Sequence, residues 1–274
     1  MPRFGSSPLA FPDFKGAARR LTLLNLAAYF VLLVATFASS SALRIASLLV
    51  FDPYAFMHGA LWQPITYSFV HRPDAIFGTL LELLSIWILA GFLEAFHDAN
   101  WVTSLYAISV LGTAAAALVL YLVSSTLAPS LLLNANPLYG CFGGIFGLLV
   151  AIGVLYGDTQ FLMLFVIGIK ARHMAIIYAI VAVAMLFGEE RMYAFALLGG
   201  ALAGFAFVRM APRRGFSFMF SESWYGMRNR YYRWKRRRAA RKFEVYMRSQ
   251  GRTVRFDGQG RQLDEDPDDK KRWN

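Results

Sequence analysis

Few side chains that could take part in catalysis or metal binding lie in the apolar part of this sequence. The only cysteine is Cys141, and the four histidines are His58, His71, His97 and His173. A thiol becomes a nucleophile in an electropositive, partly exposed setting, and the last apolar segment (193–208) carries no histidine to activate one. A single cysteine also excludes an intrachain disulfide, and from it we expect no cysteine-based zinc site of any kind. We therefore expect an inert buried thiol and no cofactor.

The histidines divide between two sides of the predicted membrane, so the sequence predicts no metal site built from them. His58 and His71 fall in the outer segment, where Asp52 or Asp74 could pair with them. The interpretation that these pairs stabilise the fold is preferred over catalysis.

Glu82 interrupts the apolar stretch 76–93. A carboxylate in such a stretch is costly unless it is neutral, paired or hydrated, and intramembrane acids often mark functional sites. In one interpretation Glu82 is protonated and bonded to a nearby hydroxyl or carbonyl, with Thr79 and Ser85 as local partners. In the other, it lines a cavity and meets a polar residue of a client helix. Both interpretations remain open at this point.

The composition indicates a membrane protein. Hydrophobic residues make up 57% of the 274 residues, charged residues 16%, and the mean hydropathy is +0.44. Soluble domains carry roughly 45–50% apolar and about 25% charged residues. The net charge of +11 lies entirely in residues 209–274, because residues 1–208 hold nine basic and nine acidic residues. The chain thus has a neutral apolar body and a cationic tail.

Six apolar segments are candidate spans, since a helix needs about 20 residues to cross a bilayer. The first could instead be a signal peptide, but its apolar run exceeds the usual length of about 7–15 residues, which favours a span. Residues 161–169 are too short to cross and are expected to form an interfacial or cytoplasmic loop. The six candidates are 21–38, 76–93, 101–124, 139–156, 174–188 and 193–208.

Basic residues near the spans predict the orientation, because they favour the cytoplasm. They place both termini there and divide the chain into a cytoplasmic N-terminus (1–20), a membrane domain (21–210) and a tail (211–274). Residues 40–75 are aromatic-rich and contain three prolines, which predicts a structured, membrane-associated loop between the first two helices. Since no organellar presequence is evident, a multi-pass protein of a bacterial inner membrane is expected.

Small residues indicate that two of these helices pack closely. In lipid, close backbone approach through small-xxx-small faces is a principal source of helix association. The fourth and sixth segments are therefore predicted to meet in the centre of the bundle. The residues concerned are Gly140, Gly143, Gly144 and Gly147 in the fourth, and Gly199, Gly200 and Gly204 in the sixth.

Several motifs, taken in order, resemble the rhomboid family of intramembrane serine proteases. The sequence WQPITYSFVH (62–71) is similar to the family's segment leading into its second span. YGCFGGIFGLL (139–149) resembles the G-x-S-G region of the fourth span, FVIGIKAR (165–172) the loop before the fifth, and LLGGALAGF (197–205) the H-x-G-G region of the sixth. The resemblance implies an all-α polytopic fold, a six-transmembrane-helix rhomboid-like bundle.

The same resemblance implies that the protease chemistry is lost. The positions matching the family's serine nucleophile and histidine base are Phe142 and Leu197. Neither side chain can attack a peptide or accept a proton. We expect a pseudoprotease that binds transmembrane helices of client proteins without cleaving them, with Glu82, Phe142 and Leu197 as candidate cavity residues.

Two other functions are alternatives to this one. An active intramembrane serine endopeptidase with a non-standard site would need another serine, such as Ser85 or Ser68, and a distant base. A transporter or channel ranks last, because it would need several embedded polar groups or broken helices.

The tail alternates cations with aromatic residues, and residues 228–248 are expected to form a helix. Because this stretch follows a span, binding to anionic lipid is favoured, and nucleic acid is an unlikely partner. Residues 251–274 are polar and expected to be disordered. The predicted headgroup-binding residues are Arg233, Lys235, Arg236, Arg237, Arg238, Arg241 and Lys242.

Overall fold

The computed structural model is mostly helical and forms two compact units, Met1–Phe216 and Ser217–Asn274. In the first unit the structure describes residues 12–38, 41–127, 137–163, 167–188 and 191–210. In the second it describes 228–236, 238–240, 243, 245–246, 249–250, 255–256 and 262–263.

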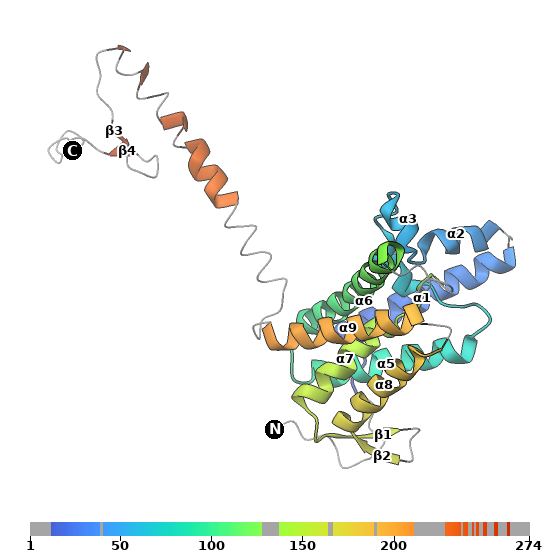
Figure 1. The fold of residues 1–274 in the computed structure, drawn as a ribbon. Helices are drawn as coiled ribbons and strands as arrows, with labels where there is room; N and C mark the ends of the chain where they lie inside the picture. The colour runs from blue at the N-terminus through green and yellow to red at the C-terminus, as the bar shows by residue number, and fades with distance from the viewer. Residues whose placement is uncertain are drawn as a thin grey trace. The chain divides into compact units, whose positions relative to one another are not determined.

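The described part of the first unit contains six helices of 14 residues or more, with several short elements between them (Figure 1). In chain order the elements are α1 (Gly16–Ala38), α2 (Ser41–Leu49), α3 (Pro53–Met57), α4 (Gln63–Thr66), η1 (Tyr67–Phe69), α5 (Ile76–Glu94), α6 (Ala99–Leu127), α7 (Phe142–Leu155), β1 (Gln160–Met163), β2 (Ile167–Lys170), α8 (Ala171–Met185) and α9 (Arg191–Met210).

Four helices of the described residues are long and apolar enough to cross a membrane: α1, α5, α6 and α9. The apolar helices α7 and α8 have only 14 and 15 residues. At 1.5 Å per residue they reach about 21–23 Å, which is less than the roughly 30 Å of a hydrocarbon core. The predicted six spans are therefore reduced to four helices of full length and two shorter ones.

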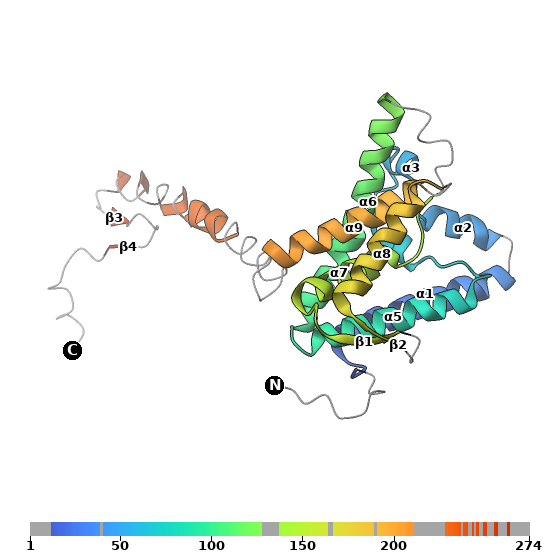
Figure 2. The ribbon, with the colours of Figure 1, turned by 60° about the horizontal axis from the view of Figure 1, so that its bottom comes forward.

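Helix α7 lies at the centre of the unit. It contacts α5, α6, α8 and α9, and nine of its 14 residues are buried. Helix α9 packs along both α6 and α7, so the three helices form one tight group (Figure 2). By contrast, α8 buries only Ala171 and Ala182. This difference places the core of the unit on the α6, α7 and α9 side.

Glycines allow these three helices to approach. A Cβ at Gly147 would overlap the Ser109 hydroxyl of α6, and one at Gly200 would overlap the Thr113 hydroxyl. At Gly204 the added atom would lie 2.8 Å from the Gly147 Cα. The predicted glycine faces thus meet α6 as well as each other. Of the remaining glycines predicted to pack, Gly143 and Gly144 face α6 residues Thr113 and Tyr106, and Gly199 faces Ala116 of α6.

Helices α1 and α5 run side by side in both views (Figures 1 and 2). The Ala18 amide of α1 donates a hydrogen bond of 3.3 Å to Glu94 Oε2 at the end of α5. An acidic group at a helix N-terminus is stabilised by the helix dipole and by the unpaired amides there. Glu94 therefore ties the start of α1 to the end of α5.

The segment between α1 and α5 is folded into α2, α3, α4 and η1 over residues 41–69, as the sequence predicted for a structured loop. The Asp52 side chain caps α3 by accepting from the Tyr54 amide. The buried Tyr67 hydroxyl donates to the Val110 carbonyl of α6 at 2.8 Å. Contacts of this kind hold the segment against the long helices.

Strands β1 and β2 pair antiparallel over residues 160–163 and 167–170, where the sequence had predicted a loop at 161–169. Pairing the two halves satisfies backbone groups that a loop would leave to water. Beside the hairpin, Lys170 Nζ lies 3.3 Å from Asp158 Oδ1 and Arg172 lies at the same distance. The hydrogen bond from Lys170, followed by the charge of Arg172, lowers the pKa of Asp158.

In the second unit, helical residues run from 228 to 236 and continue in places to 249. The predicted lipid-binding residues Arg233, Lys235, Arg236 and Arg238 are exposed there, whereas Arg237, Arg241 and Lys242 lie outside the described side chains. Strands β3 (Arg255–Phe256) and β4 (Gln262–Leu263) pair antiparallel. Residues 251–274 were expected to be disordered, whereas these four residues form two short paired strands.

Candidate functional site

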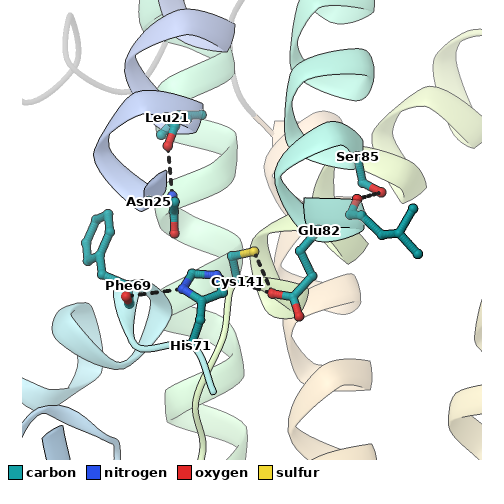
Figure 3. Close-up of polar contacts among 8 residues, drawn as sticks. Leu21, Asn25, Phe69, His71, Glu82, Ser85 and Cys141 are labelled. Atoms are coloured by element: carbon teal, nitrogen blue, oxygen red, sulfur yellow. Dashed lines mark hydrogen bonds and ion pairs between the residues drawn. The ribbon is translucent and has the colours of Figure 1, made fainter. Parts of the chain in front are cut away.

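Three side chains that are distant in sequence meet inside the first unit. His71 follows η1, Glu82 lies in the second turn of α5, and Cys141 immediately precedes α7. His71 Nε2 lies 3.3 Å from Glu82 Oε2, and Cys141 Sγ donates to the same oxygen at 3.2 Å (Figure 3). The cysteine is fully buried, and the histidine and glutamate side chains are 1% and 14% exposed.

The backbone ahead of α7 positions the cysteine. Phe51 and Leu138 exchange both backbone hydrogen bonds, at 2.9 and 2.8 Å. The Gly140 amide then donates to the Val70 carbonyl at 2.8 Å. Gly140 has φ +85°, a conformation that glycine adopts without the steric cost of a side chain. This turn brings Cys141 beside the residue that follows Val70, which is His71.

The His71 ring is oriented from both sides. Its Nδ1 lies 3.2 Å from the Phe69 carbonyl oxygen, which can only accept, so Nδ1 carries the proton of that contact. Its Nε2 is buried and close enough to Glu82 for an ion pair, yet it has no hydrogen bond of acceptable geometry. The ring is therefore fixed with Nε2 directed toward the carboxylate and thiol.

Further buried polar groups surround this cluster. The Asn25 amide donates to the Leu21 carbonyl at 2.8 Å, but its Oδ1 has no partner among the described residues. The hydroxyls of Tyr29 and Tyr106 are buried and lack a partner in the same part of the chain. The Tyr29 ring lies edge-on to His71, with 6.2 Å between centroids. Tyr106 lies near Asn25, Cys141 and Glu82.

The local partners predicted for Glu82 were wrong. Ser85 donates instead to the Leu81 carbonyl at 2.8 Å, and Thr79 is not among the contacts of the carboxylate. Glu82 interacts with residues 11 and 59 positions away, because the turns before α5 and α7 end at the same place. Long-range partners of this kind satisfy a buried carboxylate as well as local ones do.

The pairs predicted for the outer histidines were also wrong. His71 pairs with Glu82 rather than with Asp52 or Asp74, since Asp74 binds Arg72 through two hydrogen bonds. His58 Nδ1 contacts the Tyr54 carbonyl at 2.8 Å within its own short helix. Of the other two histidines, His97 follows α5 and His173 lies in the first turn of α8.

Phe142 and Leu197, the positions that the rhomboid resemblance aligns with the protease dyad, lie on separate helices. Phe142 is the first residue of α7 and is partly buried, and Leu197 of α9 is 5% exposed. Both belong to the apolar interior. The burial expected for Cys141 is confirmed, but its carboxylate and imidazole neighbours were missed. One feature of the sequence does indicate the cluster: Glu82, Cys141 and His71 are residue types that can bind metal ions, and each stands among apolar or aromatic residues.

The cluster has two chemical capacities. The Glu82 carboxylate can accept a hydrogen bond from the Cys141 thiol, and it can form an ion pair with a protonated His71. An imidazole nitrogen, a thiol sulfur and a carboxylate oxygen are also donors to metal ions, and here one such atom from each residue lies within 4.8 Å of the others. The sequence predicts no metal site, because its histidines divide between two sides of the membrane and it has one cysteine; the structure brings one histidine, one glutamate and that cysteine together.

The family described as "Eukaryotic integral membrane protein (DUF1751)" matches residues 26–214. The match begins inside α1, ends just after α9, and includes all of the helices that carry the cluster. No curated protein matches the chain.

The family description supports integral membrane localisation and, with four long apolar helices, a multi-pass protein. It does not support the expectation of a bacterial inner membrane, because the family is described as eukaryotic; a multi-pass fold and a basic tail are common to both kinds of membrane and do not distinguish them. With more than half of its length matched, this chain belongs to the eukaryotic integral membrane protein family DUF1751.

Proposed function

We propose that this protein is rhomboid-like but lacks the Ser/His dyad, and that it binds transmembrane segments of other membrane proteins without cleaving them. The observation that carries the proposal is the pair Phe142 and Leu197, two hydrocarbon side chains in the apolar interior at the positions that match nucleophile and base. Hydrolysis needs a heteroatom nucleophile and a proton acceptor. A bundle with neither can retain the shape of its relatives while losing the reaction.

The arrangement of α5 and α8 supports a site for a client helix. Both pack on α7, yet they make no extensive contact with each other in the described residues. Each presents an apolar outer face, with Phe77 and Leu80 exposed on α5 and Ile176 and Ile180 on α8. A client that lies between them would approach α7, and the partly exposed Glu82 would offer the polar contact that distinguishes one apolar helix from another.

Site-specific photocrosslinking tests this function. A photoreactive residue at Leu80 or Ile180 should capture membrane proteins in cells, and the captured proteins should be of full length. The same residue at Leu202, which is exposed on α9, serves as the matched control and should capture much less. Equal capture at all three positions would mean lipid-facing contact only, and would contradict the proposal.

A cysteine-dependent endopeptidase is the second candidate, because Cys141 Sγ bonds Glu82 and lies beside His71. A serine endopeptidase gains no support from Ser85 and Ser68, because each donates to a backbone carbonyl, of Leu81 and Ile65 respectively. Purified protein given fluorophosphonate and thiol-reactive probes, and a model transmembrane substrate, should show neither labelling of a nucleophile nor cleavage. Cleavage that disappears in Cys141→Ala would establish the enzyme instead.

The basic tail is proposed to bind anionic lipid. The lysine and arginine side chains that the structure describes there are exposed, and they alternate with exposed Tyr231, Tyr232 and Trp234. The Arg238 guanidinium lies 5.4 Å from the Trp234 ring centroid, which pairs a cation with an aromatic suited to the headgroup region. Attraction to an anionic surface is worth about 1 kcal/mol per cation.

Neutralising four described cations should therefore lower lipid binding by roughly two to three orders of magnitude. The variant carries alanine at Arg233, Lys235, Arg236 and Arg238, and the full chain in zwitterionic nanodiscs is tested for capture of phosphatidylserine vesicles. Lysine at the three arginines is the control and should preserve capture, because the attraction depends on charge. Unchanged capture by the alanine variant, or preference for RNA over vesicles, would refute this role.

A further inference from the structure

We propose that His71, Glu82 and Cys141 bind one divalent transition-metal ion, with zinc as the best fit. The ligand atoms would be His71 Nε2, Glu82 Oε2 and Cys141 Sγ, which come from three separate elements of the fold. All three atoms lie within 4.8 Å of one another. The site needs no client and no protease activity, although it shares Glu82 with the client contact proposed above.

Two of the three separations between the donor atoms agree with a tetrahedral centre. Zinc binds nitrogen and oxygen at about 2.0–2.2 Å and sulfur at about 2.3 Å, which places ligand atoms roughly 3.4–3.6 Å apart at tetrahedral angles. The observed separations are 3.3 Å between Nε2 and Oε2 and 3.2 Å between Sγ and Oε2. An ion can enter with movements of a few tenths of an ångström along these two edges.

The state of His71 provides a second, independent observation. Its Nδ1 donates to the Phe69 carbonyl, the arrangement that usually fixes the tautomer of a metal-bound histidine. Nε2 then offers a lone pair, and it is buried without a hydrogen bond while directed at a carboxylate oxygen. Two facing acceptors repel unless a cation lies between them. A proton on Nε2 would not be well directed toward Oε2, whereas a metal ion can take both lone pairs.

The charges and the surroundings are also suitable. Zinc binding would displace the thiol proton to solvent, so that the ion, the thiolate and the carboxylate sum to zero net charge. A neutral site is the form that a membrane protein interior tolerates. Three protein ligands leave one position for water. Asn25 Oδ1 and the Tyr29 hydroxyl are buried without partners among the described residues, and the Tyr106 hydroxyl is buried beside Asn25; these groups can bind such a water.

The test measures metal in the intact protein. The full chain is purified in detergent from eukaryotic cells, equilibrated with micromolar zinc, passed through a desalting column and analysed by mass spectrometry of the elements. We expect about one zinc ion per chain. After exchange with cobalt, a thiolate-to-cobalt charge-transfer band in the near ultraviolet should identify sulfur as a ligand. Wild-type protein that retains helical circular dichroism but binds neither metal would overturn the proposal.

Three variants locate the site. Cys141→Ala should remove the charge-transfer band and the zinc, and His71→Gln should remove the zinc. The matched control is His58→Gln, which alters another histidine of the same outer segment, one whose ring contacts a backbone carbonyl. It should retain both zinc and the band. If His58→Gln loses the metal, or if Cys141→Ala keeps the band, the ion binds elsewhere and the assignment is wrong.

Discussion

Gly200→Leu should prevent this protein from folding into a stable bundle. Gly200 lies where α9 crosses both α6 and α7: an added Cβ would overlap the Thr113 hydroxyl and lie 3.0 Å from the Ser109 carbonyl oxygen and 3.2 Å from that of Gly143. Overpacking a core costs about 1–3 kcal/mol where side chains can adjust. Here two of the obstacles are backbone atoms, so the cost should exceed that range. Loss of a monodisperse peak in detergent, and of a cooperative thermal transition, would be the result.

The matched control is Gly78→Leu in α5. Gly78 is exposed, and the nearest atom to its added Cβ is the Ala75 Cβ at 3.9 Å. Leucine also has a higher helix propensity than glycine, so this variant should be as stable as the wild type or slightly more stable. If both variants behave alike, glycine content rather than close helix packing determines the stability, and the arrangement of α6, α7 and α9 would need revision.

The sequence predicts the long helices well because hydropathy reports them directly. Helices α1, α5, α6 and α9 coincide with four of the six predicted segments. The fourth segment was expected to begin at 139, yet α7 begins at Phe142, since Gly140 adopts a positive φ and turns the chain. A hydropathy average cannot detect such a turn, because glycine, cysteine and phenylalanine are all compatible with an apolar helix.

The cluster could not be assembled from the sequence because its members are far apart and none has a motif. Glu82 and Cys141 are separated by 59 residues, and they meet only because the Phe51–Leu138 bridge holds the chain before α7 against the outer segment. The resemblance to rhomboids indicates Phe142 and Leu197 as the site positions. The polar centre of this bundle instead includes Cys141, the residue next to the first of them.

His71→Ala is expected to be the second most damaging substitution. Glu82 is largely buried, and in the absence of a bound metal ion His71 Nε2 is the group that the ion pairs of the described residues place against its carboxylate. Removing one partner of a buried pair leaves an uncompensated charge, which costs about 3–5 kcal/mol. The midpoint of thermal unfolding in detergent should fall accordingly, and hydrogen exchange should increase at the start of α5.

The neighbouring pair offers a direct comparison. Arg72 and Asp74 are joined at 2.6 Å, but their side chains are 58% and 65% exposed, so water replaces either partner when it is lost. Arg72→Ala should therefore shift the midpoint far less than His71→Ala, although the two residues are adjacent. An equal loss in both variants would mean that the effect arises from the backbone of this segment and not from the Glu82 charge.

A double substitution separates the charge from the packing. Suppose that the unpaired Glu82 carboxylate causes the loss of stability in the His71 variant. The loss in the double variant, His71→Leu with Glu82→Leu, should then be smaller than the sum of the losses in the two single variants, because an apolar pair leaves no group unsatisfied. Coupling between contacting residues amounts to about 0.5–3 kcal/mol. Strict additivity would instead show that His71 and Glu82 contribute independently, His71 through its bond to the Phe69 carbonyl and Glu82 through Cys141. The sign of the coupling therefore decides whether this buried pair acts as one electrostatic unit.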